Sequence, residues 1–210
     1  MKTEAFKYKD FTKVEISSTF DFKIVQSDSY EVTVDADEGL FKNLHIDVDG
    51  DTLKAYHSRH ISWVFRLSRP HIKISMPVIK ELKLSGAVSG KVSGFKSAED
   101  FKLEMDGASK VKADMEVNKC EIRMRGACNI EANGKAESII IDVNGANFLD
   151  MEDFTIQNAA IRLNGASNCK VRVDGRLDAR LAGVSNLDLA GQPTIGDIRT
   201  TGLAKINKIS

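Results

Sequence analysis

The sequence of 210 residues has little proline and cysteine, no net charge and no long apolar run. Its 30 basic residues balance 30 acidic residues, which argues against a nucleic-acid-binding protein, because such proteins usually carry a basic excess. No apolar run approaches the ~20 residues that a membrane-spanning helix needs. The N-terminus, MKTEAFKYKDF, lacks the apolar segment of a signal peptide. If Met1 is the native start, the protein is therefore expected in the cytoplasm.

The three cysteines form neither a metal-ligand pattern nor a disulfide pattern. Cys120, Cys128 and Cys169 show no Cys-x-x-Cys or Cys/His spacing, and an odd number in a chain of this size is not a disulfide framework. Each stands where other copies of the repeat described below carry small or apolar residues, so we expect buried wall residues. Glycine-rich phosphate loops are also absent. The sequence predicts no catalytic residue, no metal site and no cofactor.

One phrase built around a glycine is abundant. The glycines follow one another at intervals of 18 to 21 residues, and such a regular period predicts a repeat architecture. The seven copies are LKLSGAVSGKV (82–92), LEMDGASKVKA (103–113), IRMRGACNIEA (122–132), IDVNGANFLDM (141–151), IRLNGASNCKV (161–171), ARLAGVSNLDL (179–189) and IRTTGLAKINK (198–208).

Within each copy, apolar residues alternate with polar residues. One copy has Cys120, Ile122 and Met124 at six, four and two residues before its glycine. This period of two is typical of a strand with one buried face. The alternation resumes four and six residues after the glycine, at Ile130 and Ala132 in the same copy. A second strand is therefore predicted after each glycine turn, and no window shows helical periodicity of useful length.

Two architectures can stack such units. An antiparallel meander would use tight Asn-Gly turns, whereas a parallel β-helix makes each repeat one coil and stacks equivalent residues. The residues three before the glycine favour the β-helix, because over five copies their charges alternate and would form a favourable ladder. The small residue after most glycines would also let the wall turn sharply. The sequence thus predicts an all-β protein, a right-handed parallel β-helix (solenoid) of about seven coils of ~19 residues.

Residues 1–78 lack the glycine phrase but still alternate like strands. The turn Asp49-Gly50-Asp51 between two such segments predicts a hairpin. An open solenoid end exposes unpaired backbone and apolar core, so this region is predicted to be a β-rich cap. We therefore divide the chain into an N-terminal β region, 1–78, and β-helix repeats, 79–210. At the other end Lys208 replaces an apolar residue, and homo-oligomerisation through the solenoid ends is an open interpretation.

The N-terminal part contains the segments FDFKIVQSDSYEVTVDADEGL (20–40) and IKISMPVIKELKLSGAVSG (72–90), which lead into the repeated GAS and GAN corners. These segments resemble the opening of the head GIN domain family of auto-transporter adhesins, and the corners resemble the body of that family. The resemblance covers nearly the whole chain. It implies a β-helical fold, a bacterial cell-surface or secreted location, and adhesion. The resemblance implies no catalytic motif in this chain.

The segment around the single tryptophan is the candidate contact site. Arg59, Trp63, Phe65 and Arg66 are residue types enriched at interfaces, and aromatic faces also stack on sugars. The segment also holds His57 and His60, but three residues apart on a strand they would point to opposite faces, which disfavours a metal site. A hairpin whose aromatic side chains pack on the solenoid end remains the alternative.

The sequence favours a non-enzymatic, adhesin-like binding or structural module of a bacterial cell surface. The alternative is a carbohydrate-binding or polysaccharide-active (lyase or hydrolase-like) protein on the same scaffold, for which paired carboxylates would be needed. The coils are short and nearly equal, so the long loops of a catalytic cleft are not expected, and the enzymatic alternative stays open. The expected partners are a glycan or a surface protein.

Overall fold

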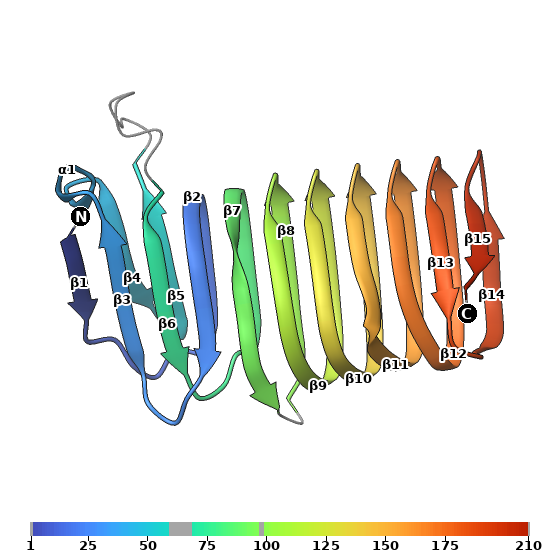
Figure 1. Ribbon diagram of the computed structural model, residues 1–210, viewed down its shortest axis with the longest axis horizontal. Helices are drawn as coiled ribbons and strands as arrows, with labels where there is room; N and C mark the ends of the chain where they lie inside the picture. The colour runs from blue at the N-terminus through green and yellow to red at the C-terminus, as the bar shows by residue number, and fades with distance from the viewer. Residues whose placement is uncertain (1, 59–68, 97–98, 210) are drawn as a thin grey trace.

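The computed structural model describes residues 2–58, 69–96 and 99–209 and is built almost entirely of β-strands. The strands stack as parallel coils into an elongated solenoid of about six turns, with the two chain ends at opposite ends of the stack (Figure 1). The predicted all-β solenoid is confirmed, and the repeats gave nearly the right number of turns. The backbone hydrogen bonds between coils run along the long axis of the molecule.

Each of the central strands is a complete coil. The strand numbering follows the chain: β9 (Lys110–Gly126), β10 (Asn129–Gly145), β11 (Phe148–Gly165) and β12 (Asn168–Gly183). Before them lie β7 (Glu81–Lys96) and β8 (Phe101–Gly107), and after them β13 (Asn186–Ala190), β14 (Thr194–Thr200) and β15 (Lys205–Lys208). Every pairing among these strands is parallel.

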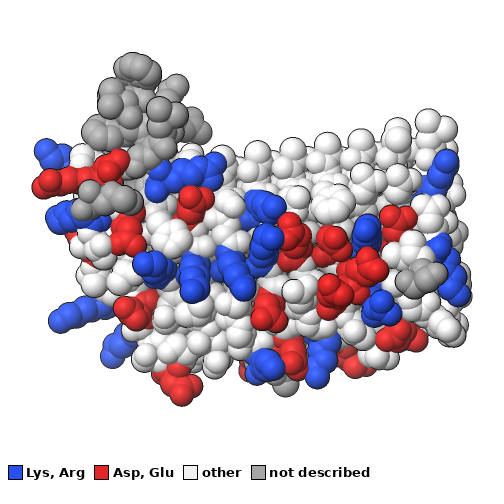
Figure 2. Space-filling view, viewed as in Figure 1, with Lys and Arg blue, Asp and Glu red and all other residues white. Residues whose placement is uncertain are grey.

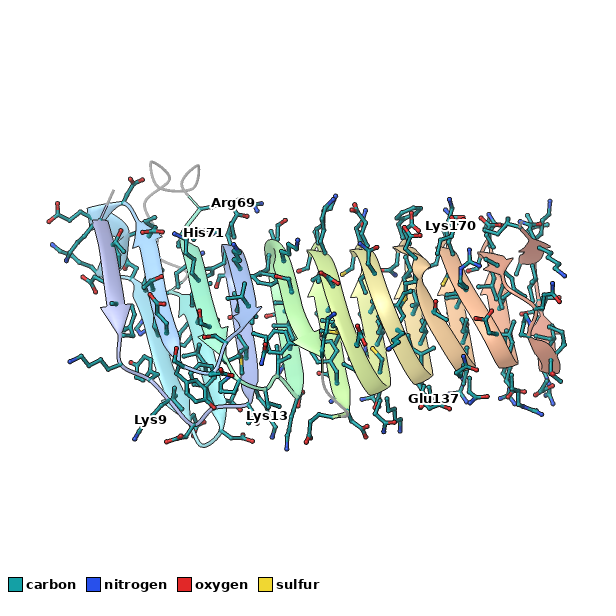
Figure 3. The ribbon with its side chains drawn as sticks, turned by 60° about the horizontal axis from the view of Figure 1, so that its bottom comes forward. Lys9, Lys13, Arg69, His71, Glu137 and Lys170 are labelled. Atoms are coloured by element: carbon teal, nitrogen blue, oxygen red, sulfur yellow. The ribbon has the colours of Figure 1, made fainter. Side chains whose placement is uncertain are left out.

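The alternation read from the sequence places the core correctly. Ile122 pairs with Leu103 on one side and Ile141 on the other, so equivalent apolar residues form columns along the axis. All three side chains are buried, and the intervening residues point outward. Figure 3 shows two such outward side chains, Glu137 and Lys170, at opposite edges of the stack. Stacked columns of this kind give the solenoid one continuous apolar core.

The glycine corners are required by close contact between coils. Gly145 has a φ of 114°, and a Cβ built there would lie 2.3 Å from the carbonyl oxygen of Gly126 in the preceding coil. That same oxygen accepts a hydrogen bond from the backbone N–H of Ala146 at 2.9 Å. The other corners repeat this geometry. Only glycine combines the left-handed backbone with the close approach, which explains why the phrase is repeated.

After the first copy, which has Val88 at this place, the residue after each Gly-Ala pair points inward and binds the corner backbone. Ser167 donates its hydroxyl proton to the carbonyl of Gly145 at 3.1 Å and accepts the N–H of Asn147 at 3.3 Å. Asn147 in turn accepts the N–H of Cys128 at 2.9 Å through Oδ1. These small polar groups are buried but hydrogen-bonded, as buried polar groups must be. The polar residue two positions after the glycine therefore provides hydrogen bonds for the backbone groups of the corner.

The N-terminal part adds both a coil and antiparallel strands. Strand β2 (Lys13–Gln26) is a coil that pairs with β7 on one side and with β5 (Thr52–His57) and β6 (His71–Met76) on the other. Ser18 occupies its glycine slot with a φ of 77°. The remaining elements are β1 (Lys2–Phe6), β3 (Glu31–Ala36), the short helix α1 (Glu38–Phe41) and β4 (Leu44–Asp49).

Strands β1, β3 and β4 run antiparallel to their partners and lie at the N-terminal end of the stack (Figure 1). The hairpin predicted at Asp49-Gly50-Asp51 is present as the β4–β5 pair. The division of the chain at residue 78 stays a prediction.

Candidate functional site

The four residues chosen from the sequence, Arg59, Trp63, Phe65 and Arg66, lie outside the described residues. Their proposed contact role therefore stays a prediction. The structure offers a different candidate on the outer wall of the solenoid. We call this wall the charged face: the outward side of the strand segments that lead into the glycine corners.

Opposite charges alternate in two rows on the first half of the charged face. The rows are formed by the residues five and three before each corner. Within a coil, Lys102 lies 2.6 Å from Glu104, and between coils it lies 3.4 Å from Glu81. Arg123 lies 2.6 Å from Glu121 and 3.5 Å from Glu104. The hydrogen bond from Lys102 lowers the pKa of Glu104. These charges neutralise one another across the coils.

In the row five residues before the corners, the alternation stops at β10 and β11. Ile140 and Ala160 occupy the outward position five before their corners, and Ile140 is 39% exposed. Beside them Arg162 is exposed and forms no ion pair with any residue that the structure describes. A shallow hollow of about 510 Å³ lies at this place. Its lining residues are Ile140, Ile141, Asp142, Ala160, Ile161, Arg162, Asp178, Ala179, Arg180 and Asp197.

On the far side of the hollow, the charged side chains again form ion pairs. Arg180 lies 3.0 Å from Asp197, and Arg176 makes two hydrogen bonds of 2.9 Å with Asp178. The hydrogen bonds from Arg176, and then from the backbone N–H of Asp197, lower the pKa of Asp178 to about 2. The ion pairs to Arg180 and Arg199 also lower the pKa of Asp197. The site therefore combines an apolar floor, ionised carboxylates and the guanidinium of Arg162, which is unpaired within the described part of the chain.

This arrangement fits recognition better than acid–base catalysis. A general acid for glycoside cleavage needs a raised pKa, whereas Asp178 and Asp197 both have lowered values. Within the described ranges, no three His, Cys, Asp or Glu side chains gather closely enough to hold a metal ion. No helix in the described part of the chain is long and apolar enough to cross a bilayer.

A second hollow, of about 520 Å³, is lined by charged side chains that already pair with one another. Glu116 lies there between Lys96 at 3.3 Å and Lys135 at 2.9 Å. Both lysines lower the pKa of Glu116, chiefly through hydrogen bonds, with that from Lys135 the larger. A ligand at this place would have to compete with ion pairs that already exist, so the hollow at Ile140 is the better candidate.

The glycine corners form an uncharged edge beside these faces. In Figure 2 the upper edge of the solenoid, where β9 to β12 end in Figure 1, carries no Lys, Arg, Asp or Glu. Its outermost residues are alanines over most of the length, and then Val184 and Leu203, which are 58% and 72% exposed. The charged face and this edge divide the outer surface into chemically distinct strips.

Sequence reasoning found one row of the charged face and missed the other. The alternation three residues before the corners was recognised, and the ion pair between Arg123 and Glu104 in neighbouring coils agrees with it. The row five residues before the corners was not considered. Its signal was present, because Glu121 is followed by Ile140 and Ala160 before Asp178 restores the charge.

These features define a class: a parallel β-solenoid whose coils turn at stacked glycine–small–polar corners. The chain belongs to the family described as “Putative auto-transporter adhesin, head GIN domain”, which matches residues 10–193. No protein with a curated description matches it.

Solved structures share the whole fold. A “putative lipid binding protein” from Parabacteroides distasonis is 24% identical with a TM-score of 0.76, and covers 100% of this chain and 96% of its own. A “putative adhesin” from Bacteroides fragilis is 16% identical with a TM-score of 0.87, at 99% and 96% coverage. Another from Parabacteroides merdae is 16% identical with a TM-score of 0.75, at 100% and 96% coverage. At these identities the similarity establishes the fold.

Proposed function

We propose that this chain is a non-enzymatic, adhesin-like binding module of a bacterial cell surface, and that it contacts its partner through the hollow on the charged face. Family membership supports the adhesive role and the surface location. The observation that carries the choice of site is the break in the outer charge row at Ile140 and Ala160, beside Arg162, which has no ion-pair partner among the described residues. Elsewhere on this face a ligand would have to displace existing ion pairs.

The partner that fits is a glycan or a surface protein with an apolar patch and an acidic group. The apolar floor would take a sugar ring face or an aliphatic side chain, and Arg162 would bind a carboxylate in a bidentate manner. The carboxylates of Asp142 and Asp178 would accept hydrogen bonds from hydroxyl groups. The segment with Trp63 remains a second proposed contact.

The proposal is tested with a glycan array and with purified bacterial surface polysaccharides, using wild type, Arg162→Ala, Ile140→Asp and Trp63→Ala. Lys83→Ala is the matched control, because Lys83 lies on the same face but pairs with Glu15 at 3.5 Å. We expect Arg162→Ala and Ile140→Asp to weaken binding at least about tenfold, the size of one lost charged contact, and Lys83→Ala to leave it unchanged. Equal binding by all variants would remove the hollow as the contact site.

The alternative is a polysaccharide-active protein, for which the carboxylates of Asp142, Asp178 and Asp197 around the hollow are the supporting observation. Its test is the release of reducing ends, or of the ultraviolet-absorbing unsaturated ends that a lyase makes, from the polysaccharides that bind. Turnover that is lost in Asp178→Asn would establish the enzyme and reject the binding module.

A further inference from the structure

The C-terminal end of the stack presents two free strand edges (Figure 1). Strand β14 pairs with β12, and β15 pairs with β13. Among the residues that the structure describes, no strand covers either of them on the opposite side. Free edges of this kind carry unpaired backbone N–H and C=O groups and readily add another strand.

Two apolar side chains lie along the free edge of β14. Ile195 stacks on Leu177 and Ile198 stacks on Ala179, and both of these underlying residues are buried. The two isoleucines therefore continue core columns of the solenoid, but Ile195 is 56% exposed and Ile198 is only partly buried. A further strand placed on β14 would bury both columns.

The two edges differ in how well they are protected. On β15, Lys208 stacks on the buried Leu189, so it takes a core position at the rim. An inward-directed lysine of this kind opposes the addition of another strand. Strand β14, TIGDIRT, has no lysine and no proline, and its inward residues are apolar or threonine. The unprotected edge is therefore β14.

We propose that β14 pairs with β14 of a second copy of this chain, antiparallel about a two-fold axis at Ile198. The segment Asp197-Ile198-Arg199 is complementary to itself when reversed. In this register Asp197 faces Arg199 of the second copy, the same contact recurs by symmetry, and the two Ile198 side chains meet. Directly opposite charges and apolar pairs are the contacts that stabilise an antiparallel pair.

The geometry of the side chains within one copy agrees with this register. Asp197 lies 3.0 Å from Arg180 and 3.2 Å from Arg199, so its carboxylate stands on the outer face of the rim strand together with both guanidinium groups. A second Arg199 would join this cluster from the other copy. A two-fold contact uses the same patch twice and closes, whereas stacking the C-terminal end on the N-terminal end would extend into filaments.

The test is the mass of the purified chain in solution, measured by sedimentation and by light scattering during gel filtration. We expect the wild type to be a dimer that dissociates on dilution. Asp197→Lys would place Lys against Arg199, and Arg199→Glu would place Glu against Asp197, so each variant alone should be monomeric. Mixed in equal amounts, the two variants regain both attractive contacts and should form a heterodimer. Lys2→Glu, at the opposite end, should remain dimeric.

Cross-linking gives a readout that does not depend on the charge variants folding well. In an antiparallel pair centred on Ile198, the two Ile198 Cα atoms are directly opposite, within the range that a disulfide spans. Ile198→Cys should therefore form a covalent dimer on mild oxidation, while Lys208→Cys should not. The native cysteines are buried and do not interfere.

Four results would overturn the proposal. The first is a wild type that stays monomeric up to the highest soluble concentration. The second is growth into open oligomers instead of dimers. The third is a mixture of folded Asp197→Lys and Arg199→Glu that stays monomeric. The fourth is equal cross-linking of Ile198→Cys and Lys208→Cys.

Discussion

At the scale of single residues, two glycines separate the cost of a left-handed backbone from the cost of a steric clash with the neighbouring coil. Gly145 and Gly50 both have positive φ angles, of 114° and 61°. A Cβ at Gly145 would lie 2.3 Å from the carbonyl oxygen of Gly126, whereas a Cβ at Gly50 would meet nothing within 4 Å. The left-handed backbone alone costs an L-residue about 1 kcal/mol, and the steric clash is added only at the corner.

We therefore expect Gly50→Ala to lower the free energy of unfolding by about 1 kcal/mol and Gly145→Ala to lower it by about 3 kcal/mol or more. Urea unfolding followed by circular dichroism measures both variants. Equal losses would mean that the backbone conformation, and not the contact between coils, makes glycine necessary at the corners.

Two buried cysteines should respond differently to the same substitution by serine. Cys120 pairs in register with Phe101 and Ile139 in the apolar wall, and burial raises its pKa to about 12. Cys128 occupies the polar corner slot, where its thiol lies 3.6 Å from the carbonyl of Gly107 and Ser167 occupies the equivalent place.

Cys120→Ser should cost about 1–3 kcal/mol, because a hydroxyl there has no partner, while Cys128→Ser should be neutral or stabilising. Thermal unfolding distinguishes the two variants. In the folded wild type, neither thiol should react with a thiol reagent at pH 8. A destabilised Cys128→Ser would contradict the assignment of this slot to corner hydrogen bonding.

At the scale of the strand, the ion pairs beside the hollow make a pH-dependent contribution. The hydrogen bonds from Arg176 and the N–H of Asp197 lower the pKa of Asp178 to about 2 in the folded state, below the ~3.9 of an unfolded chain. This stabilisation is therefore fully present above about pH 4 and is lost as the pH falls through about 2. The difference in unfolding free energy between wild type and Asp178→Asn should shrink over that window.

The titration of Asp178 over this pH range can be observed directly by NMR. The carboxyl carbon of Asp178 should titrate with a midpoint near 2, as the lowered pKa requires. A midpoint near the unfolded value would show that the contacts with Arg176 are not maintained in solution.

What could be predicted for each strand depended on whether the signal was local. The alternation of Ile122 and its neighbours fixed which side chains are buried, because the period of two is a property of the strand itself. Strand β2 was not recognised as a coil, since Ser18 stands in its glycine slot and breaks the phrase. The hollow at Ile140 was missed because it depends on which outward residues become neighbours across coils.

At the scale of the whole molecule, each coil contacts chiefly its two neighbours. Strand β10 is in register with β9 on one side and with β11 on the other. Stability in such a stack is approximately a sum over coils and their contacts. The pairing order itself was not predictable, because β2 lies between β6 and β7 although those two follow each other in the chain.

Removing one complete coil should therefore leave a folded protein. Deletion of residues 127–145, the span between the paired corners Gly126 and Gly145, would join two equivalent corner positions and place β9 against β11. We expect a soluble, cooperatively unfolding chain with an unchanged circular dichroism spectrum per residue. Deletion of residues 127–135, about half a coil, would shift the strands onto the wrong walls and should abolish folding. If both deletion variants folded, or both failed to fold, the description of stability as a sum over coils and their nearest neighbours would be contradicted.

The direction of the hydrogen bonds between coils has a mechanical consequence. The chain ends lie at opposite ends of the stack, so tension between them acts along these bonds and peels the terminal coil first. Each coil that detaches releases roughly 60 Å of extended chain. A stack of this design would unfold from its end in nearly equal steps, so work is absorbed coil by coil while the remaining coils stay folded.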